Sequence, residues 1–232
     1  MSTTVQAPVL VVGAGPVGLT LALDLAWRGI DVIVVETRPC GEPPPAKCNH
    51  VSARTMEIYR RLGIAGEIRN AGLPGDYPND VSFRTTFTGI ELARIPIPCR
   101  NDRYSATDGP DTGWPTPEPP HRINQIYLEP ILSERAAATA EISLYWHTEF
   151  ISLLQNETGV TATLQSIDSG ETVRARCDYL VGCDGGSSTV RRSIGSRFGG
   201  DAVLQRCQSS FIRSETLIRM QSEAAALSLI HI

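Results

Sequence analysis

The sequence of 232 residues predicts an α/β fold in which helices pack against a largely parallel sheet. Three observations support this prediction. An apolar run at 8–13, a helical pattern at 15–28 and a second apolar run at 31–36 follow one another directly. A glycine-rich motif joins the first run to the helix. Segments of alternating polarity after residue 140 predict further strands.

The composition is that of an ordinary globular protein and excludes several classes. Hydrophobic residues make up 41% and charged residues 20%, so a buried core is expected. The net charge of −4 argues against nucleic-acid binding driven by bulk charge. The sequence contains no run of 18 apolar residues, so no membrane-spanning helix is expected, and the N-terminus lacks a signal-peptide pattern. The six cysteines form no C-x-x-C pair, so we expect reduced thiols in a cytoplasmic protein and no metal site.

The chain begins with a strand–helix–strand unit. Residues 8–13 are almost entirely apolar, which is typical of a parallel strand buried on both faces. Residues 15–28 carry apolar side chains at helical spacing, and Gly29 stands where a helix C-cap favours a residue that tolerates positive φ. Residues 31–36 form a second buried strand, which completes the unit.

The rest of the chain alternates between helical and strand-like segments. Ser52 can cap a helix that runs through Leu62 and ends at Gly63. Five prolines between residues 99 and 120 predict a long surface loop. The other expected elements are strands at 81–98 with a turn at Gly89, a helix at 124–139, strands at 142–154, 159–167 and 172–183, and a short helix at 187–194.

The glycine motif has the spacing G-x-G-x-x-G. Gly13 allows a tight turn, Gly15 lets the backbone approach a pyrophosphate, and Gly18 lets the helix pack closely on the sheet. The helix start offers free N–H groups and a positive dipole end to phosphates. The motif alone is weak evidence, but its place between a strand and a helix, with Glu36 closing the next strand, predicts a dinucleotide site. The motif comprises Gly13, Ala14, Gly15, Pro16, Val17 and Gly18.

Glu36 is the expected partner of the adenosine ribose. Its carboxylate can accept two hydrogen bonds from the ribose hydroxyls, and its charge would repel a 2′-phosphate. The pocket is therefore expected to hold FAD or NAD rather than NADP. Arg38 follows two residues later and either stacks near the adenine or is solvated, and the sequence leaves both roles open.

A second motif distinguishes between FAD and NAD as the bound dinucleotide. Residues 178–192 read as an apolar strand, an Asp-Gly turn at Asp184 and Gly185, and a helix start that includes Ser and Arg. Together with segments 52–63 and 124–129, this motif resembles the class A flavoprotein monooxygenases, the p-hydroxybenzoate-hydroxylase-like aromatic hydroxylases. The resemblance covers residues 8 to about 200. It implies a Rossmann-like FAD-binding fold of the glutathione-reductase type, with ββα layers and added antiparallel strands.

The resemblance also implies roles for individual residues. The glycines and Glu36 would hold the FAD pyrophosphate and ribose, and Gln125 would contact the ribityl–phosphate stretch. Asp184 and Gly185 would lie near the pyrophosphate and also serve NAD(P)H binding. The family places a cation in the loop before the second helix, and Lys47 and Arg54 are both candidates. Arg54, Gln125 and Asp184 each have a plain structural alternative as well.

The resemblance implies a monooxygenase that uses FAD, NAD(P)H and O₂ to hydroxylate an aromatic or polyketide-like small molecule through a flavin hydroperoxide. Alternatives are a non-catalytic FAD-binding fragment, or another flavoprotein oxidoreductase on the same fold. A halogenase is disfavoured because its Trp-x-Trp-x-x-Ile segment is absent. No catalytic side chain is assigned. The four histidines, 50, 121, 147 and 231, stand apart and are expected to be structural or solvated.

The predicted domain organisation has one main domain and an unusual tail. Residues 1–200 are expected to form the FAD-binding domain, interrupted at about 75–122 by a hairpin and loop that belong to the substrate side. Residues 201–232 would begin a substrate domain, as a truncated or aberrant tail. The chain is thus expected to be an N-terminal fragment, and its oligomeric state is not predicted.

Overall fold

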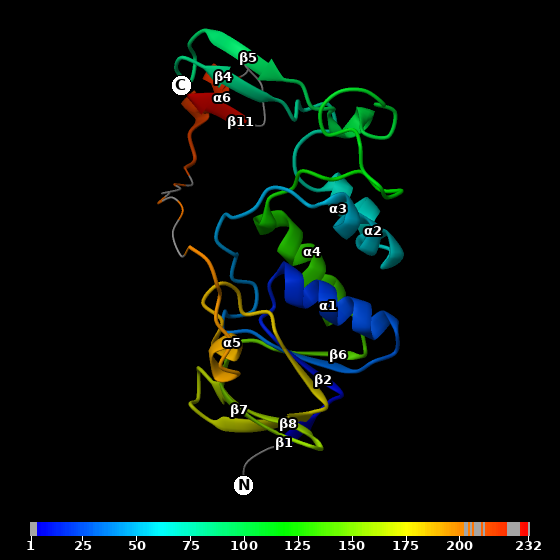
Figure 1. Ribbon diagram of the computed structural model, residues 1–232, viewed down its shortest axis with the longest axis vertical. Helices are drawn as coiled ribbons and strands as arrows, with labels where there is room; N and C mark the ends of the chain where they lie inside the picture. The colour runs from blue at the N-terminus through cyan, green and yellow to red at the C-terminus, as the bar shows by residue number, and fades with distance from the viewer. Residues whose placement is uncertain are drawn as a thin grey trace. The chain divides into compact units, whose positions relative to one another are not determined.

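The computed structural model describes residues 4–201, 204, 206, 210, 212–221 and 228–231, so much of the tail at 201–232 lies outside the described residues. The chain divides into two units (Figure 1). The first unit comprises Met1–Pro45 and Leu128–Arg206, and the second comprises Ala46–Tyr127 and Cys207–Ile232. The predicted domain boundaries remain a prediction.

The centre of the first unit is a four-stranded parallel sheet in the order β10-β2-β3-β6. Every residue of β2 and β3 is buried, as expected for strands covered on both faces. The strands are β2 (Val9–Val12), β3 (Val32–Val35), β6 (Ile142–Tyr145) and β10 (Tyr179–Gly182). Helix α1 (Pro16–Trp27) packs on one face of this sheet (Figure 1).

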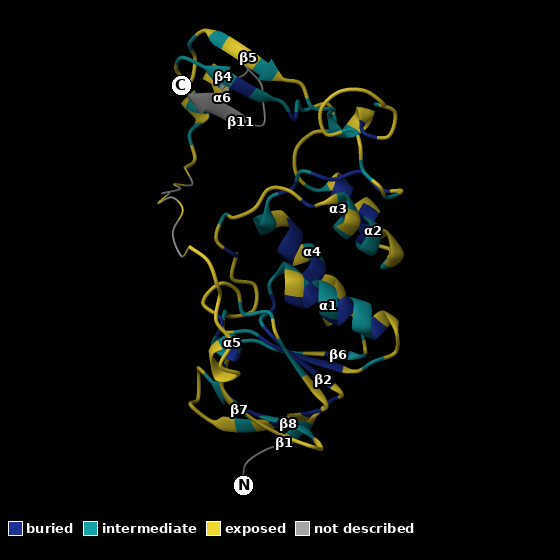
Figure 2. Cartoon of the chain, viewed as in Figure 1, coloured by how far each residue is buried: buried dark blue, intermediate teal, exposed yellow. Residues whose placement is uncertain are grey.

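A second sheet in the order β1-β9-β8-β7 covers the other face of the central sheet. Its strands are β1 (Thr4–Gln6), β7 (Thr148–Asn156), β8 (Gly159–Ser166) and β9 (Thr172–Cys177). Leu10 and Ile33 of the central sheet belong to one buried core with Leu164 and Ala175 of the second sheet. Figure 2 shows the strands of the central sheet in the colour of buried residues. The three ββα layers confirm the predicted fold class, and the short α5 (Thr189–Ser193) follows β10.

Two predicted strands are wrong in one respect, because each is two strands that belong to different sheets. The segment 142–154 divides into β6 and β7 at His147, whose φ is +50°. The segment 172–183 divides into β9 and β10 at Asp178, where the amides of Asp178 and Tyr179 both donate to the carbonyl of Pro8, at 3.0 and 3.1 Å. Hydrophobic periodicity continues through both crossings, so the pattern could not reveal them.

The second unit contains the helices α2 (Ala53–Arg61) and α3 (Ala65–Asn70), the first of which was predicted and the second missed. The Ser52 side chain accepts a hydrogen bond from the Thr55 amide at 3.3 Å, which confirms the predicted cap. The remaining elements are β4 (Val81–Arg84), β5 (Glu91–Ile95), the 3₁₀ turn η1 (Arg100–Asp102), α6 (Glu215–Gln221) and β11 (Ser228–His231).

Strands β4 and β5 form the predicted antiparallel hairpin, and β11 pairs with β4 in parallel. The hairpin turn passes through Gly89, whose amide donates to Thr86 at 3.1 Å. Helix α4 (Gln125–Ala137) starts in the second unit and continues in the first. None of the helices within the described ranges has the length and apolar character needed to cross a membrane.

Candidate nucleotide-binding site

Two of the three motif glycines are required by the fold itself. Gly13 lies between β2 and α1 with φ at +104°, and a Cβ there would come within 2.5 Å of the carbonyl oxygen of Cys183. A Cβ on Gly18 would overlap the carbonyl oxygen of Gly13. Any side chain at either position would therefore displace backbone, so these glycines set the turn and the close packing of α1.

Gly15 differs from the other two glycines because an added Cβ there would not collide with the backbone. Its φ is an ordinary −74°, and the nearest atom to an added Cβ is Glu129 Oε1 at 3.6 Å. Pro16 occupies the first turn of α1, and no side chain caps the helix start. The first-turn amides thus have no competing side-chain acceptor, and Val17 beside them is 71% exposed. This open cradle fits an anionic pyrophosphate.

The carboxylate of Glu36 lies against this turn, at the end of β3. Its Oε2 accepts a hydrogen bond from the Ala14 amide at 2.8 Å, and its Oε1 accepts from the Arg38 amide at 3.0 Å and from Arg38 Nε at 3.3 Å. Burial opposes ionisation, but these donors outweigh it and lower the pKa of Glu36. Oε2 carries one protein hydrogen bond, so it is the oxygen with capacity for a ribose hydroxyl.

Arg38 is largely buried rather than solvated, in an ion pair with a carboxylate far from it in the sequence. Its Nη1 and Nη2 donate to Glu129 Oε2 and Oε1 at 3.2 and 3.1 Å, a bidentate ion pair. The two side chains are only 23% and 6% exposed. Burial would lower the pKa of Arg38, but its bonds to Glu129 and Glu36 raise it overall. The in-plane donors of the guanidinium are thus engaged by protein carboxylates, and its stacking near the adenine stays a prediction.

Glu129 was not selected as a site residue from the sequence. It is 4% exposed and lies on α4 beside the buried Leu128 and Leu132. A charged residue is almost never fully buried unless it is paired, so its place on the apolar stripe of a helix was the signal that could have revealed it.

The Asp184-Gly185 turn follows β10 and meets the glycine turn at the carboxyl ends of adjacent strands. Asp184 Oδ2 accepts from the amides of Thr189 and Val190 at 2.6 and 3.1 Å, so it holds the start of α5. Its Oδ1 is buried without a hydrogen-bond partner. Burial opposes ionisation, yet the bonds from Ser188, Val190 and Thr189 lower the pKa of Asp184. Gly185 has φ at +78°, as the turn requires.

The other predicted residues, Lys47, Arg54 and Gln125, belong to the second unit and are described within it. The amide of Gln125 donates to the carbonyl of Cys48 at 3.1 Å, next to a ladder in which Val51 pairs with His121. The start of α4 and the exposed Lys47 loop are thereby neighbours. Arg54 is 77% exposed and pairs with Glu57 at 2.6 Å on its own helix.

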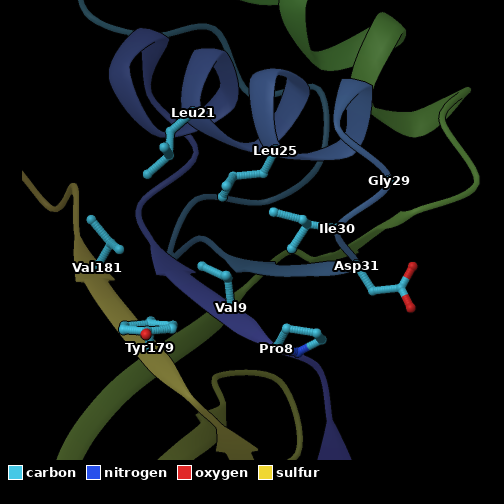
Figure 3. A pocket seen from close by; sticks show the side chains of 9 residues that line it. All are labelled: Pro8, Val9, Leu21, Leu25, Gly29, Ile30, Asp31, Tyr179 and Val181. Carbon is cyan, nitrogen blue, oxygen red and sulfur yellow. The ribbon is translucent and has the colours of Figure 1, made fainter.

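An apolar pocket of about 520 Å³ lies at the other end of the central sheet (Figure 3). It is lined by residues that include Val9 and Tyr179 at the starts of their strands and Leu25 near the end of α1. The carboxylate of Asp31 points away from these apolar side chains. The glycine turn follows the opposite ends of the strands, so this pocket is separate from the nucleotide site.

Comparison with known proteins identifies FAD as the dinucleotide. Residues 6–227 match the FAD binding domain family. The chain is 33% identical over 202 residues to 2,4-dichlorophenol 6-monooxygenase of Delftia acidovorans, covering 84% of this chain and 32% of that protein. It is 36% identical over 205 residues to aklavinone 12-hydroxylase RdmE of Streptomyces purpurascens, covering 84% of this chain and 36% of that protein. The chain thus spans about a third of the length of these relatives.

Solved structures give the same result. The rebeccamycin biosynthetic enzyme RebC with reduced flavin superposes with a TM-score of 0.79 at 31% identity, covering 99% of this chain and 42% of that one. The flavin-dependent monooxygenase PieE in complex with FAD and substrate superposes with a TM-score of 0.71 at 34% identity, covering 82% of this chain and 32% of that one. The open Gly15 cradle, the ionised Glu36 and the Asp184 turn fit FAD, and the chain belongs to the FAD binding domain family.

Proposed function

We propose that this chain is the FAD-binding part of a monooxygenase that uses NAD(P)H and O₂ to hydroxylate an aromatic or polyketide-type ring. The observation that carries the proposal is the meeting of the glycine turn, Glu36 and the Asp184 turn at one edge of the central sheet. Relatives named for 2,4-dichlorophenol and aklavinone support the reaction class and the kind of ring.

Each residue of the site has a proposed task toward FAD. The backbone at Gly15 and the first-turn amides of α1 receive the pyrophosphate, and Glu36 Oε2 accepts a hydrogen bond from the adenosine ribose. Asp184 and Gly185 hold the adjoining turn in shape. FAD itself supplies the redox chemistry when bound, and the chain contributes orientation and exclusion of water.

Selectivity for FAD over NADP follows from the charge on Glu36. An ionised carboxylate at the ribose repels a 2′-phosphate, and the lowered pKa keeps Glu36 ionised at neutral pH. In the second unit, we assign Lys47 and Gln125 to the phosphate and ribityl side of the cofactor, because the contact between Cys48 and Gln125 makes their segments neighbours. Arg54 is the weaker candidate, since Glu57 already neutralises it.

The test is the identity of the cofactor that copurifies with the chain. The cofactor released by denaturing the protein is identified by HPLC. Calorimetry then compares the binding of FAD, NAD and NADP to the stripped protein. We expect FAD in the extract and the tightest binding for FAD. Copurified NADP, or tighter binding of NADP than of FAD, would contradict the assignment of Glu36. Hydroxylation is tested separately with NADH, NADPH and a panel of phenols.

A further inference from the structure

We propose that Glu129 is a positioning residue that acts through Arg38 on Glu36 and thereby sets the affinity for the adenosine half of FAD. The inference rests on the proposed FAD site, in which Glu36 receives the ribose. It assigns a function to a buried carboxylate that makes no direct contact with Glu36.

The four groups form one continuous chain of hydrogen bonds within the first unit. Glu129 on α4 accepts from both terminal nitrogens of Arg38, whose Nε donates to Glu36 Oε1. Glu36 Oε2 in turn accepts from the Ala14 amide in the glycine turn. A side chain from residue 129 is thus connected to the backbone at residue 14.

The planarity of the guanidinium makes this connection directional. All five N–H groups of arginine lie in one plane, so two parallel bonds to Glu129 fix the direction in which Nε points. That direction leads to Glu36 Oε1 at 3.3 Å. Thr37 Oγ1 and the Arg38 amide also donate to Oε1, at 3.3 and 3.0 Å. Oε1 is therefore fully used, and Oε2 is turned toward the glycine motif with capacity for one more donor.

The pair also controls charge beside the pyrophosphate position. Glu129 Oε1 lies 3.6 Å from the position of a Cβ on Gly15, where the backbone is open to a ligand. Arg38 neutralises one of the two carboxylates that face this turn, Glu36 and Glu129. Without the Arg38 cation, a dinucleotide would meet two uncompensated negative charges.

The test measures dissociation constants of FAD, ADP and FMN by calorimetry for the wild type, Glu129→Gln, Glu36→Gln and the double variant. Glutamine keeps the shape of residue 129 but loses the charged bidentate pair. We expect FAD and ADP to bind about tenfold more weakly to Glu129→Gln, because a charge-assisted pair is lost. FMN, which lacks the adenosine ribose, should bind as it does to the wild type.

The double variant separates positioning from a general structural effect. If Glu129 acts through Glu36, the Glu129→Gln change should weaken FAD binding no further once Glu36 is glutamine. Arg38→Lys keeps the positive charge without the planar fork and should reproduce the loss for FAD and ADP. Glu134→Gln is the matched control, because Glu134 is an exposed glutamate on the same helix.

Three results decide the matter. Equal weakening of FAD and FMN, or the same loss with and without Glu36, would show a structural role and overturn the inference. Unchanged FAD affinity in Glu129→Gln would overturn it while leaving the proposed function intact. A wild type that binds neither FAD nor ADP would overturn both. Arg38→Lys keeps the inference testable if Glu129→Gln does not fold, since it disturbs the same pair from the other side.

Discussion

At the scale of single residues, the glycine motif separates into two kinds of position. The sequence predicted different roles for Gly13, Gly15 and Gly18, and the structure gives the roles of Gly13 and Gly18 a physical cause. A Cβ at Gly13 or Gly18 would collide with the backbone, whereas a Cβ at Gly15 would meet Glu129 Oε1 at an ordinary contact distance. Among the three glycines, Gly15 is therefore the one whose substitution can separate cofactor binding from folding.

We expect Gly15→Ala to fold normally and to lose at least about tenfold in FAD affinity. The added methyl group meets Glu129 Oε1 at an ordinary contact distance of 3.6 Å, but it occupies the space through which a pyrophosphate must approach. Thermal unfolding checks the fold, and fluorescence titration measures the affinity. Gly18→Ala is the contrasting variant and should lose the folded state. Wild-type FAD affinity in Gly15→Ala would show that the glycines only make a turn.

The Glu36 carboxylate should make a pH-dependent contribution to stability. Its folded pKa lies below the ordinary value of 4.5, so the contribution is fully present above 4.5 and disappears as the pH falls through the lowered value. Urea unfolding of wild type and Glu36→Gln should show a difference at pH 7 that shrinks at acid pH. A difference that is the same at both pH values would contradict an ionised, hydrogen-bonded Glu36.

Sequence reasoning identified the residues that follow strands better than the contacts between distant segments. The glycine turn and Glu36 lie at strand ends, where position along the chain already predicts position in space. The partnership of Arg38 with Glu129 joins residues 91 positions apart, and no local pattern predicts it. The sequence therefore predicted a carboxylate beside the glycine turn, whose role at the ribose stays a prediction, but it missed the pair that holds this carboxylate.

At the scale of elements, the main difference from the sequence prediction is the transfer of strands between sheets. The pairs β6–β7 and β9–β10 each read as one strand because alternating apolar residues continue past the crossing point. The crossings depend on backbone features such as the positive φ of His147. The three-layer order was still predictable, since it follows from the β2–α1–β3 unit and the strands after residue 140.

His121, in the backbone ladder between residues 49–51 and 121–123, should make the stability of the second unit depend on pH. Burial and the nearby Arg69 cation lower the pKa of His121 to about 4. Its Nε2 lies 3.1 Å from the carbonyl of Ile68, so the neutral ring donates there. His121 takes up a proton near pH 6.5 in the unfolded chain and near pH 4 in the folded chain. The free energy of unfolding should therefore decrease by about 3 kcal/mol as the pH falls from 6.5 to 4.

Amide hydrogen exchange in the ladder is the measurement, with Val51 and Ile123 as reporters. Protection should decrease from pH 7 to pH 4.5 after correction for the intrinsic exchange rate. His121→Gln should remove most of this dependence, whereas His147→Gln, in the first unit, should leave it unchanged. Equal pH dependence in the wild type and His121→Gln would show that another group is responsible.

At the scale of the whole molecule, FAD binding and hydroxylation make different demands on the chain. For binding, we propose the turns at the carboxyl edge of the central sheet, which the first unit supplies, together with Lys47 and Gln125 of the second unit. Productive oxygen transfer also needs a closed pocket that excludes water from the reacting atoms. In the relatives compared here, about two thirds of the length lies outside the matched region.

We therefore expect the 232-residue polypeptide to bind FAD but to oxidise NAD(P)H without hydroxylating a ring. Water reaching the flavin diverts the reducing equivalents to hydrogen peroxide, because the activated oxygen is lost before it meets the substrate. The measurement compares NAD(P)H consumed, peroxide formed and hydroxylated product for a panel of phenols. Peroxide should account for nearly all of the NAD(P)H oxidised. Free FAD at the same concentration controls for background oxidation. Hydroxylated product in proportion to NAD(P)H would show that these 232 residues already enclose a complete reaction site.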